Sequence, residues 1–165
     1  MSPQWESQEL LQPITDEQPC GENVEYTLLP TLSDFKVFGK DQPIDPPPEW
    51  DAIRALSLEA LRKSKDIRLL AYLGTALLRS DGLRAFVGTL DIASQWLQTY
   101  WAGVYPLIDD GDAVERKNAL NYFADKMAVL DGLRRAPLVV SPQHGRFSLR
   151  DLDIAAGLKI GRAHV

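Results

Sequence analysis

The sequence is poor in the residues from which small catalytic and metal sites are usually built. It holds one cysteine, Cys20, and two histidines, His144 and His164, among 165 residues. A single cysteine excludes an internal disulfide, and three such side chains cannot supply the four nitrogen or sulfur ligands of a structural zinc site. A Walker-type phosphate loop is absent, and the acidic segment 109–112 lacks the EF-hand ligand spacing. We therefore expect no metal and no cofactor.

Positive charge and long apolar runs are also in short supply. The net charge is -5 and the isoelectric point is about 5.0. This balance disfavours binding to nucleic acid or to an anionic membrane surface. The longest apolar stretch, residues 69–78, falls well short of the roughly 20 residues that cross a bilayer, and the N-terminus has no signal-peptide pattern. These features favour a cytoplasmic protein without membrane insertion.

Proline divides the chain into two unequal parts. Residues 1–48 hold eight of the eleven prolines, three of them consecutive at 46–48. Because consecutive prolines lack N–H donors and keep the backbone extended, residues 39–48 are predicted to form an exposed loop. We expect the segment 1–48 to wrap over a helical bundle formed by residues 49–157 of the same domain. Residues 158–165 are read as a tail.

The second part carries the spacing of long amphipathic helices. Apolar residues recur every three or four positions in four segments that begin near residues 49, 64, 83 and 112. Ser64 is the predicted N-cap of the second segment, whose apolar residues lie nearly all round the helix, as in the middle of a bundle. Pro106 and Pro137 are expected to end the third and fourth. With no alternating strand pattern, the fold class is predicted as all-α: a bundle of four long helices, followed by a short helix at 148–156.

The third segment is predicted to bury one face, because its apolar residues recur at helical spacing. Its predicted apolar face consists of Leu83, Phe86, Val87, Leu90, Ala93, Leu97, Tyr100 and Val104.

Cys20 is the one residue with an obvious nucleophile, in the sequence Pro19-Cys20-Gly21. A catalytic thiol requires a base, and His144 is the histidine outside the tail. We favour a buried thiol in a turn formed by Pro19 and Gly21. The alternative is a small helical enzyme that uses Cys20 or a pair of carboxylates.

Aromatic and cationic clusters have a structural and a binding interpretation. The residues Trp96, Tyr100, Trp101 and Tyr105 follow one another at helical spacing, which is typical of core residues and, less often, of a partner-binding surface.

Positive charge is unfavourable at the start of a helix, where Lys65 and Arg68 lie. Our first interpretation is a buried pairing of Asp66 with an arginine that locks two helices together. A docking surface is the second.

Several short motifs, taken in order, carry a family resemblance. They are Pro13-Ile14, Pro19-Cys20-Gly21-Glu22 with Glu25-Tyr26, Trp50, Ser64-Lys65-Asp66-Ile67-Arg68, Gly82-Leu83, Tyr100-Trp101 with Tyr105-Pro106, Arg116 with Asn118-Ala119-Leu120, and Arg135-Ala136-Pro137-Leu138. The set resembles the ImpA-type N-terminal domain of TssA-like proteins in bacterial type VI secretion systems, over residues 10–155. Each motif is weak alone, and the ordered set is specific. Tyr105 departs from the family's frequent histidine, and Ile67 from its usual leucine.

The resemblance implies a non-enzymatic, protein-binding domain of an assembly factor. TssA-like proteins engage the baseplate and help the tube and sheath to polymerise, so the implied partners are baseplate, tube, sheath or spike-tip components. Rings are formed by C-terminal regions that these residues do not include, so the full-length protein is expected to be oligomeric. A TagA-like role in stopping the sheath and a purely structural oligomerisation domain remain as alternatives.

Two sets of residues follow from these considerations. Partner contacts are predicted at Lys65, Arg68, Trp50, Asp45 and Tyr105. Structural roles are predicted for Pro19, Cys20, Gly21, Tyr26, Asp66, Trp101 and Arg116.

Overall fold

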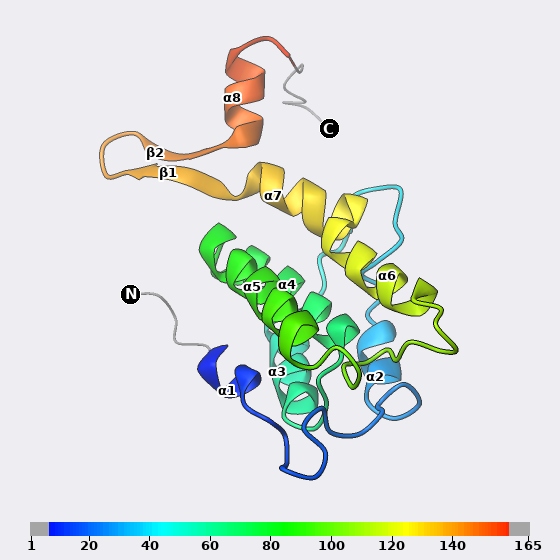
Figure 1. Ribbon diagram of the computed structural model, residues 1–165. Helices are drawn as coiled ribbons and strands as arrows, with labels where there is room; N and C mark the ends of the chain where they lie inside the picture. The colour runs from blue at the N-terminus through cyan, green and yellow to red at the C-terminus, as the bar shows by residue number, and fades with distance from the viewer. Residues whose placement is uncertain (1–6, 159–165) are drawn as a thin grey trace.

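The computed structural model describes residues 7–158, which form a mainly helical domain with one small two-stranded sheet (Figure 1). The α-helices are α1 (Ser7–Leu11), α2 (Leu29–Ser33), α3 (Trp50–Leu61), α4 (Ile67–Ser80), α5 (Leu83–Thr99), α6 (Val114–Asn121), α7 (Asp131–Arg135) and α8 (Leu149–Ala155). A 3-10 turn (η1, Tyr122–Ala124) and a π-helical turn (η2, Lys126–Leu130) lie between α6 and α7. The strands are β1 (Pro137–Ser141) and β2 (Gly145–Ser148).

Helix α4 is the centre of the domain. Its residues from Ile67 to Leu78 are buried except for Arg68, as the apolar sequence predicts. Helices α3 and α5 pack against it most extensively, and α6 also contacts it. Each buried leucine or isoleucine contributes roughly 1.5–3 kcal/mol through removal of apolar surface from water. The buried hydroxyl of Thr75 donates to the carbonyl of Ala71, so this polar group adds no unpaired donor to the core.

The start of α4 differs from the prediction. Asp66, and not Ser64, is the N-cap: its Oδ1 accepts a hydrogen bond of 2.9 Å from the backbone N–H of Arg68. Asp66 directly precedes the first helical residue, Ile67, and has the extended backbone conformation of an N-cap. Ser64 lies two residues earlier in the chain and so cannot cap this helix. Ser64 is fully buried, and its hydroxyl has no hydrogen-bond partner among the described residues.

The buried face of α5 was predicted only in part. Phe86 and Ala93 are buried as expected, whereas Val87 is 50% exposed and Leu90 is 39% exposed. The buried residues of α5 are instead Ala85, Phe86, Thr89, Ile92, Ala93 and Trp96. The helix is apolar over more than half of its circumference, so the spacing of apolar residues does not determine which part of this wide apolar surface is buried. The helix also ends at Thr99, well before Pro106.

The predicted fourth long helix is interrupted. Asp125 has a ψ of 134°, which breaks the helix between η1 and η2. Its carboxylate accepts hydrogen bonds from the backbone N–H of Ala128, at 2.9 Å, and from that of Gly39, at 2.8 Å. The break is therefore stabilised by two interactions of Asp125: it caps η2, and it is hydrogen-bonded to the loop that follows α2. Residues 7–158 form three long helices and one broken segment, so this part of the chain does not contain the predicted bundle of four long helices.

The C-terminal part holds a two-stranded hairpin, which the all-α prediction did not include. Strand β1 pairs antiparallel with β2. Ser148 then caps α8 in a capping box with Asp151, at the start of the short helix predicted at 148–156. In Figure 1 the hairpin and α8 project from the helical body. Of the predicted tail 158–165, all but Leu158 lies outside the described residues.

The N-terminal segment adds to the core through a few well-separated side chains. Leu10, Cys20, Val24, Leu32 and Val37 are all buried. Within residues 7–158, no helix combines the length and the apolar character needed to cross a membrane.

Candidate protein-binding site

Lys65, predicted as a docking residue, lies in the interior with 1% of its surface exposed. Its Nζ donates a hydrogen bond of 2.7 Å to the carbonyl oxygen of Leu10, at the end of α1. The rings of Trp96 and Tyr100 flank the ammonium at 5.2 Å from each centroid, a cation–π arrangement. This prediction was wrong because Lys65 stands between two polar residues, Ser64 and Asp66, and a lysine in a polar motif is usually solvated. A charge reversal at Lys65 would bury a carboxylate against a carbonyl and disrupt folding instead of testing docking.

The buried ammonium predicts a pH dependence of stability. Burial lowers the pKa of Lys65 from 10.5 to about 8, and the negative charge of the Cys20 thiolate opposes this shift. Between pH 8 and 10.5 the unfolded chain binds more protons at Lys65 than the folded chain, so the Lys65 contribution to the free energy of unfolding rises with pH. Deprotonation of Cys20 and Tyr72, whose pKa values burial raises, acts in the opposite direction.

The comparison with Lys65→Met isolates this contribution. We expect the difference in melting temperature, wild type minus variant, to increase from pH 7 to pH 10 in thermal unfolding followed by circular dichroism. The variant retains Tyr72, so the titration of Tyr72 cancels in the difference. Loss of the Lys65 charge removes an interaction that lowers the pKa of Cys20, so the stability of the variant falls further as the pH rises, which changes the difference in the same direction. A difference that stays flat or falls over this range would contradict the assignment.

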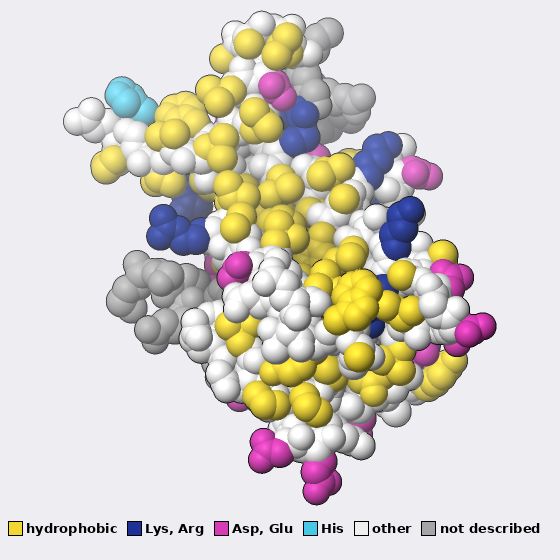
Figure 2. All heavy atoms as spheres, in the orientation of Figure 1, with side chains coloured by type: hydrophobic (Ala, Val, Ile, Leu, Met, Phe, Trp, Pro, Cys, Tyr) yellow, Lys and Arg dark blue, Asp and Glu magenta, His cyan; other side chains and the backbone are white. Residues whose placement is uncertain are grey.

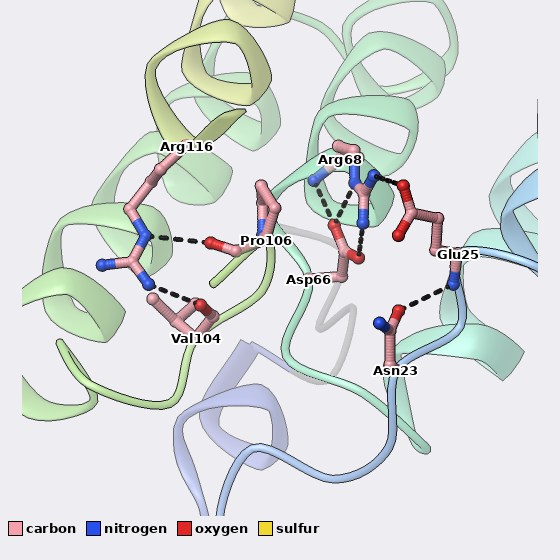
Figure 3. A network of polar contacts seen from close by, with 7 residues as sticks. All are labelled: Asn23, Glu25, Asp66, Arg68, Val104, Pro106 and Arg116. Atoms are coloured by element: carbon pink, nitrogen blue, oxygen red, sulfur yellow. Dashed lines mark hydrogen bonds and ion pairs between the residues drawn. The ribbon is translucent and has the colours of Figure 1, made fainter. Parts of the chain in front are cut away.

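Asp66 and Arg68 form a buried ion pair at the start of α4 (Figure 3). Two nitrogens of Arg68 donate to the two carboxylate oxygens of Asp66, at 3.0 and 2.8 Å. Glu25, from the N-terminal segment, forms an ion pair with the same guanidinium at 3.6 Å. Burial alone would lower the pKa of Arg68, and the two carboxylates outweigh it and raise the pKa. The predicted pairing of Asp66 with an arginine exists, but it lies within the start of α4 and does not join two helices. The ion pair between Arg68 and Glu25 is what joins α4 to the N-terminal segment.

The side chain of Arg116 fixes the loop between α5 and α6. Its guanidinium donates to the carbonyl oxygens of Trp101 at 2.8 Å, Val104 at 2.7 Å and Pro106 at 3.2 Å (Figure 3 draws the last two). The guanidinium carbon also lies 4.8 Å from the centroid of the Trp101 ring. Because Arg116 is 2% exposed, burial lowers its pKa, and the three carbonyls supply the polar contacts that water would otherwise provide. The loop is thereby fixed at three points.

Backbone hydrogen bonds join three distant segments beside this loop. The N–H of Lys65 donates to the carbonyl of Cys20 at 2.8 Å, and the N–H of Tyr105 donates to the carbonyl of Lys65 at 2.9 Å. The hydroxyl of Tyr105 reaches the carbonyl of Gly21 at 3.3 Å. Tyr105, predicted as a partner contact, thus also has a structural function.

The joined segments border an open groove of about 470 Å³. Its lining includes the motif residues Pro19, Cys20, Gly21, Tyr100, Trp101 and Tyr105, and also Gly103 and Leu107. Trp101 is 53% exposed and Leu107 is 46% exposed, so an apolar edge faces solvent. The sequence did not single out Leu107, since a lone leucine after a proline has no distinctive pattern. We refer to this feature as the Trp101 groove.

The remaining predicted site residues lie elsewhere. Asp45 is in the exposed loop between α2 and α3. Trp50 is half-buried at the start of α3, where the guanidinium of Arg79 lies 5.3 Å from its ring. Tyr26 is 86% exposed, so its predicted structural role finds no packing in the structure. Neither Asp45, Trp50 nor Tyr26 lines the Trp101 groove.

The groove offers little for chemistry. Burial raises the pKa of the Cys20 thiol, which favours the unreactive form. In the described part of the chain, no three His, Cys, Asp or Glu side chains are grouped to hold a metal ion. The exposed aromatic surface, fixed by buried polar contacts, is suited to binding another molecule by apolar contact.

Comparison with known proteins identifies the family. The family described as "ImpA, N-terminal, type VI secretion system" matches residues 11–125. The chain belongs to this family. The match contains every residue of the Trp101 groove and ends at Asp125, where the fourth helical segment breaks.

Two relatives of this ImpA N-terminal domain are informative. The "Type VI secretion system component TssA1" of Pseudomonas aeruginosa is 33% identical over 162 residues, covering 91% of this chain and 46% of TssA1. The solved N-terminal domain of the TssA component from Burkholderia cenocepacia, which includes the conserved ImpA_N region, superposes with a TM-score of 0.73. That similarity covers 92% of this chain and 58% of the other at 23% identity, and it shows the fold alone. The chain thus spans about half the length of the relatives it matches.

Proposed function

We propose that this domain is a non-enzymatic protein-binding module of a cytoplasmic type VI secretion assembly factor, engaging a baseplate, tube, sheath or spike-tip component. One observation carries the proposal. Motif residues from two segments far apart in the sequence, at positions 19–21 and at 100, 101 and 105, converge on a single exposed aromatic groove. The proposal includes an oligomeric full-length protein, assembled through a region outside this sequence.

The way in which Trp101 is held supports a binding role. Exposed aromatic side chains are favoured anchors at protein interfaces, where a few residues supply most of the binding free energy. Trp101 is half-exposed, and Arg116 fixes both its ring and its carbonyl. A side chain held in place before binding loses less conformational entropy on association.

A pull-down of the purified chain against separately purified baseplate, tube, sheath and spike-tip proteins tests the proposal. We expect specific capture of one component and at least a tenfold weaker affinity for Trp101→Ala, because an anchor aromatic contributes about 2 kcal/mol or more. Val114→Ala is the matched control, since Val114 is similarly exposed at 52% and lies outside the groove.

Thermal melts of all three proteins separate binding from folding. A folded Trp101→Ala variant that binds as well as wild type would exclude the groove as the site. Failure of the wild type to capture any component would overturn the proposed function of the isolated domain.

A further inference from the structure

A second groove lies on another part of the surface, between the hairpin and the corner where α4 turns into α5. Its volume is about 670 Å³, within the range of protein ligand sites. Residues of α4 and α5 form one wall, and Leu138, Val140 and Arg146 of the hairpin form the other. It shares no residue with the Trp101 groove. We call it the hairpin groove.

The walls of the hairpin groove expose apolar side chains that find little cover within the described chain. Val87 of α5 is 50% exposed, Leu138 is 48% exposed and Val140 is 64% exposed. Figure 2 shows hydrophobic side chains over the hairpin and on the adjoining helical surface. The hairpin packs on α8 and only sparsely on α4 and α5. Because a lone two-stranded hairpin is marginally stable in water, a partner that covers these side chains would stabilise it.

The charge at the hairpin groove is positive, in a chain whose net charge is -5. Arg84 and Arg146 are exposed, and neither has an ion pair within the residues that the structure describes. The other charged residues of the lining are already engaged. Asp81 pairs with Arg54 at 3.3 Å, and Arg79 donates to the carbonyls of Met127 and Ala128. Two arginines are therefore available to a partner.

We propose that the hairpin groove binds an acidic amphipathic segment of a partner protein. Its apolar side chains would cover Val87, Leu138 and Val140, and its carboxylates would pair with Arg84 and Arg146. Arginine is suited to this role because its planar guanidinium binds a carboxylate through two parallel hydrogen bonds. A nucleic acid fits less well, since it would leave the apolar walls uncovered.

A second copy of this chain is a poorer occupant for an electrostatic reason. In a two-fold symmetric dimer the same surface of both copies meets, so each Arg84–Arg146 pair would approach its own symmetry mate. Like charges brought together in an interface oppose association. A partner with carboxylates has the complementary charge.

Selection from a phage-displayed library of random 16-residue peptides tests the class of partner directly. We expect the immobilised chain to enrich peptides that combine two or more Asp or Glu with large apolar residues. The most enriched peptide, synthesised and titrated by calorimetry, is expected to bind the Arg84→Glu/Arg146→Glu variant at least tenfold more weakly. The Lys117→Glu/Lys126→Glu variant has the same change in charge at exposed positions outside the groove and is expected to bind like wild type.

A charge exchange separates recognition from misfolding. The same peptide with its acidic residues replaced by lysine is expected to bind the Arg84→Glu/Arg146→Glu variant more tightly than it binds the wild-type protein. Enriched peptides without acidic residues, equal loss in both double variants, or no enrichment would each overturn the proposal. Sedimentation that reveals a dimer disrupted by Val87→Asp would overturn it in favour of a second copy. This inference does not rest on the proposed function, because Trp101→Ala is expected to leave peptide binding unchanged.

Discussion

Arg116→Met is expected to lower the free energy of unfolding by about 3 kcal/mol or more. The substitution keeps an unbranched apolar stem but removes every donor to the carbonyls of Trp101, Val104 and Pro106. A buried carbonyl left without a donor costs about 1–3 kcal/mol, and the ring of Trp101 also loses its cationic neighbour. Urea denaturation followed by far-ultraviolet circular dichroism measures the change.

The neighbouring residue supplies the control for this experiment. Lys117→Met removes the same unit of charge from α6, but Lys117 is exposed, so its effect is expected to stay within about 0.5 kcal/mol. Arg116→Lys should recover little stability, because one ammonium cannot reproduce the geometry of a guanidinium that contacts three separate carbonyls. If Arg116→Met were within 1 kcal/mol of wild type, the loop between α5 and α6 would not depend on Arg116.

Gly21→Ala is expected to destabilise the domain by about 3 kcal/mol or more, or to prevent folding. A Cβ at this position would lie 2.0 Å from the carbonyl oxygen of Lys63, which belongs to rigid backbone. The φ of +72° adds strain for any residue with a side chain. To remove this steric overlap, the backbone hydrogen bonds that join Cys20 to Lys65 and Glu22 to Lys63 would have to break. Urea denaturation, with soluble yield at expression as a second measure, tests the expectation.

Gly39→Ala separates backbone strain from steric overlap. Gly39 has a similar φ of +79°, but a Cβ there would meet no atom within 4 Å. Its substitution is expected to cost about 1 kcal/mol, the strain of the left-handed conformation alone. Equal losses at the two glycines would mean that the approach of Lys63 is not what requires glycine at position 21.

The parts of the fold that follow from sequence are those set by local pattern. The apolar run of α4 predicted a fully buried helix, and the short helix predicted at 148–156 is found as α8, with Ser148 as its cap. The break at Asp125 could not be predicted this way, because neither proline nor glycine marks it. It depends on a hydrogen bond from Gly39, which is 86 residues away in the chain.

The candidate site shows the same division between local and distant causes. The motifs at Cys20 and Trp101 were identified in the sequence, but their meeting in one groove depends on backbone pairing between segments far apart. The misassignment of Lys65 has a similar origin. A lysine in a polar motif is usually solvated, and only the three-dimensional structure places the carbonyl of Leu10 and two aromatic rings around it.

The unequal burial of α4 and the hairpin has a consequence for how the domain opens. Helix α4 has almost no solvent-facing side, so we expect its amide hydrogens to exchange only when the whole domain unfolds. Strands β1 and β2 are exposed along most of their length and rest mainly on α8, so we expect them to open at much lower free energy while the helices stay closed. The expected behaviour is that of one cooperative unit around α4 with a hairpin that opens separately.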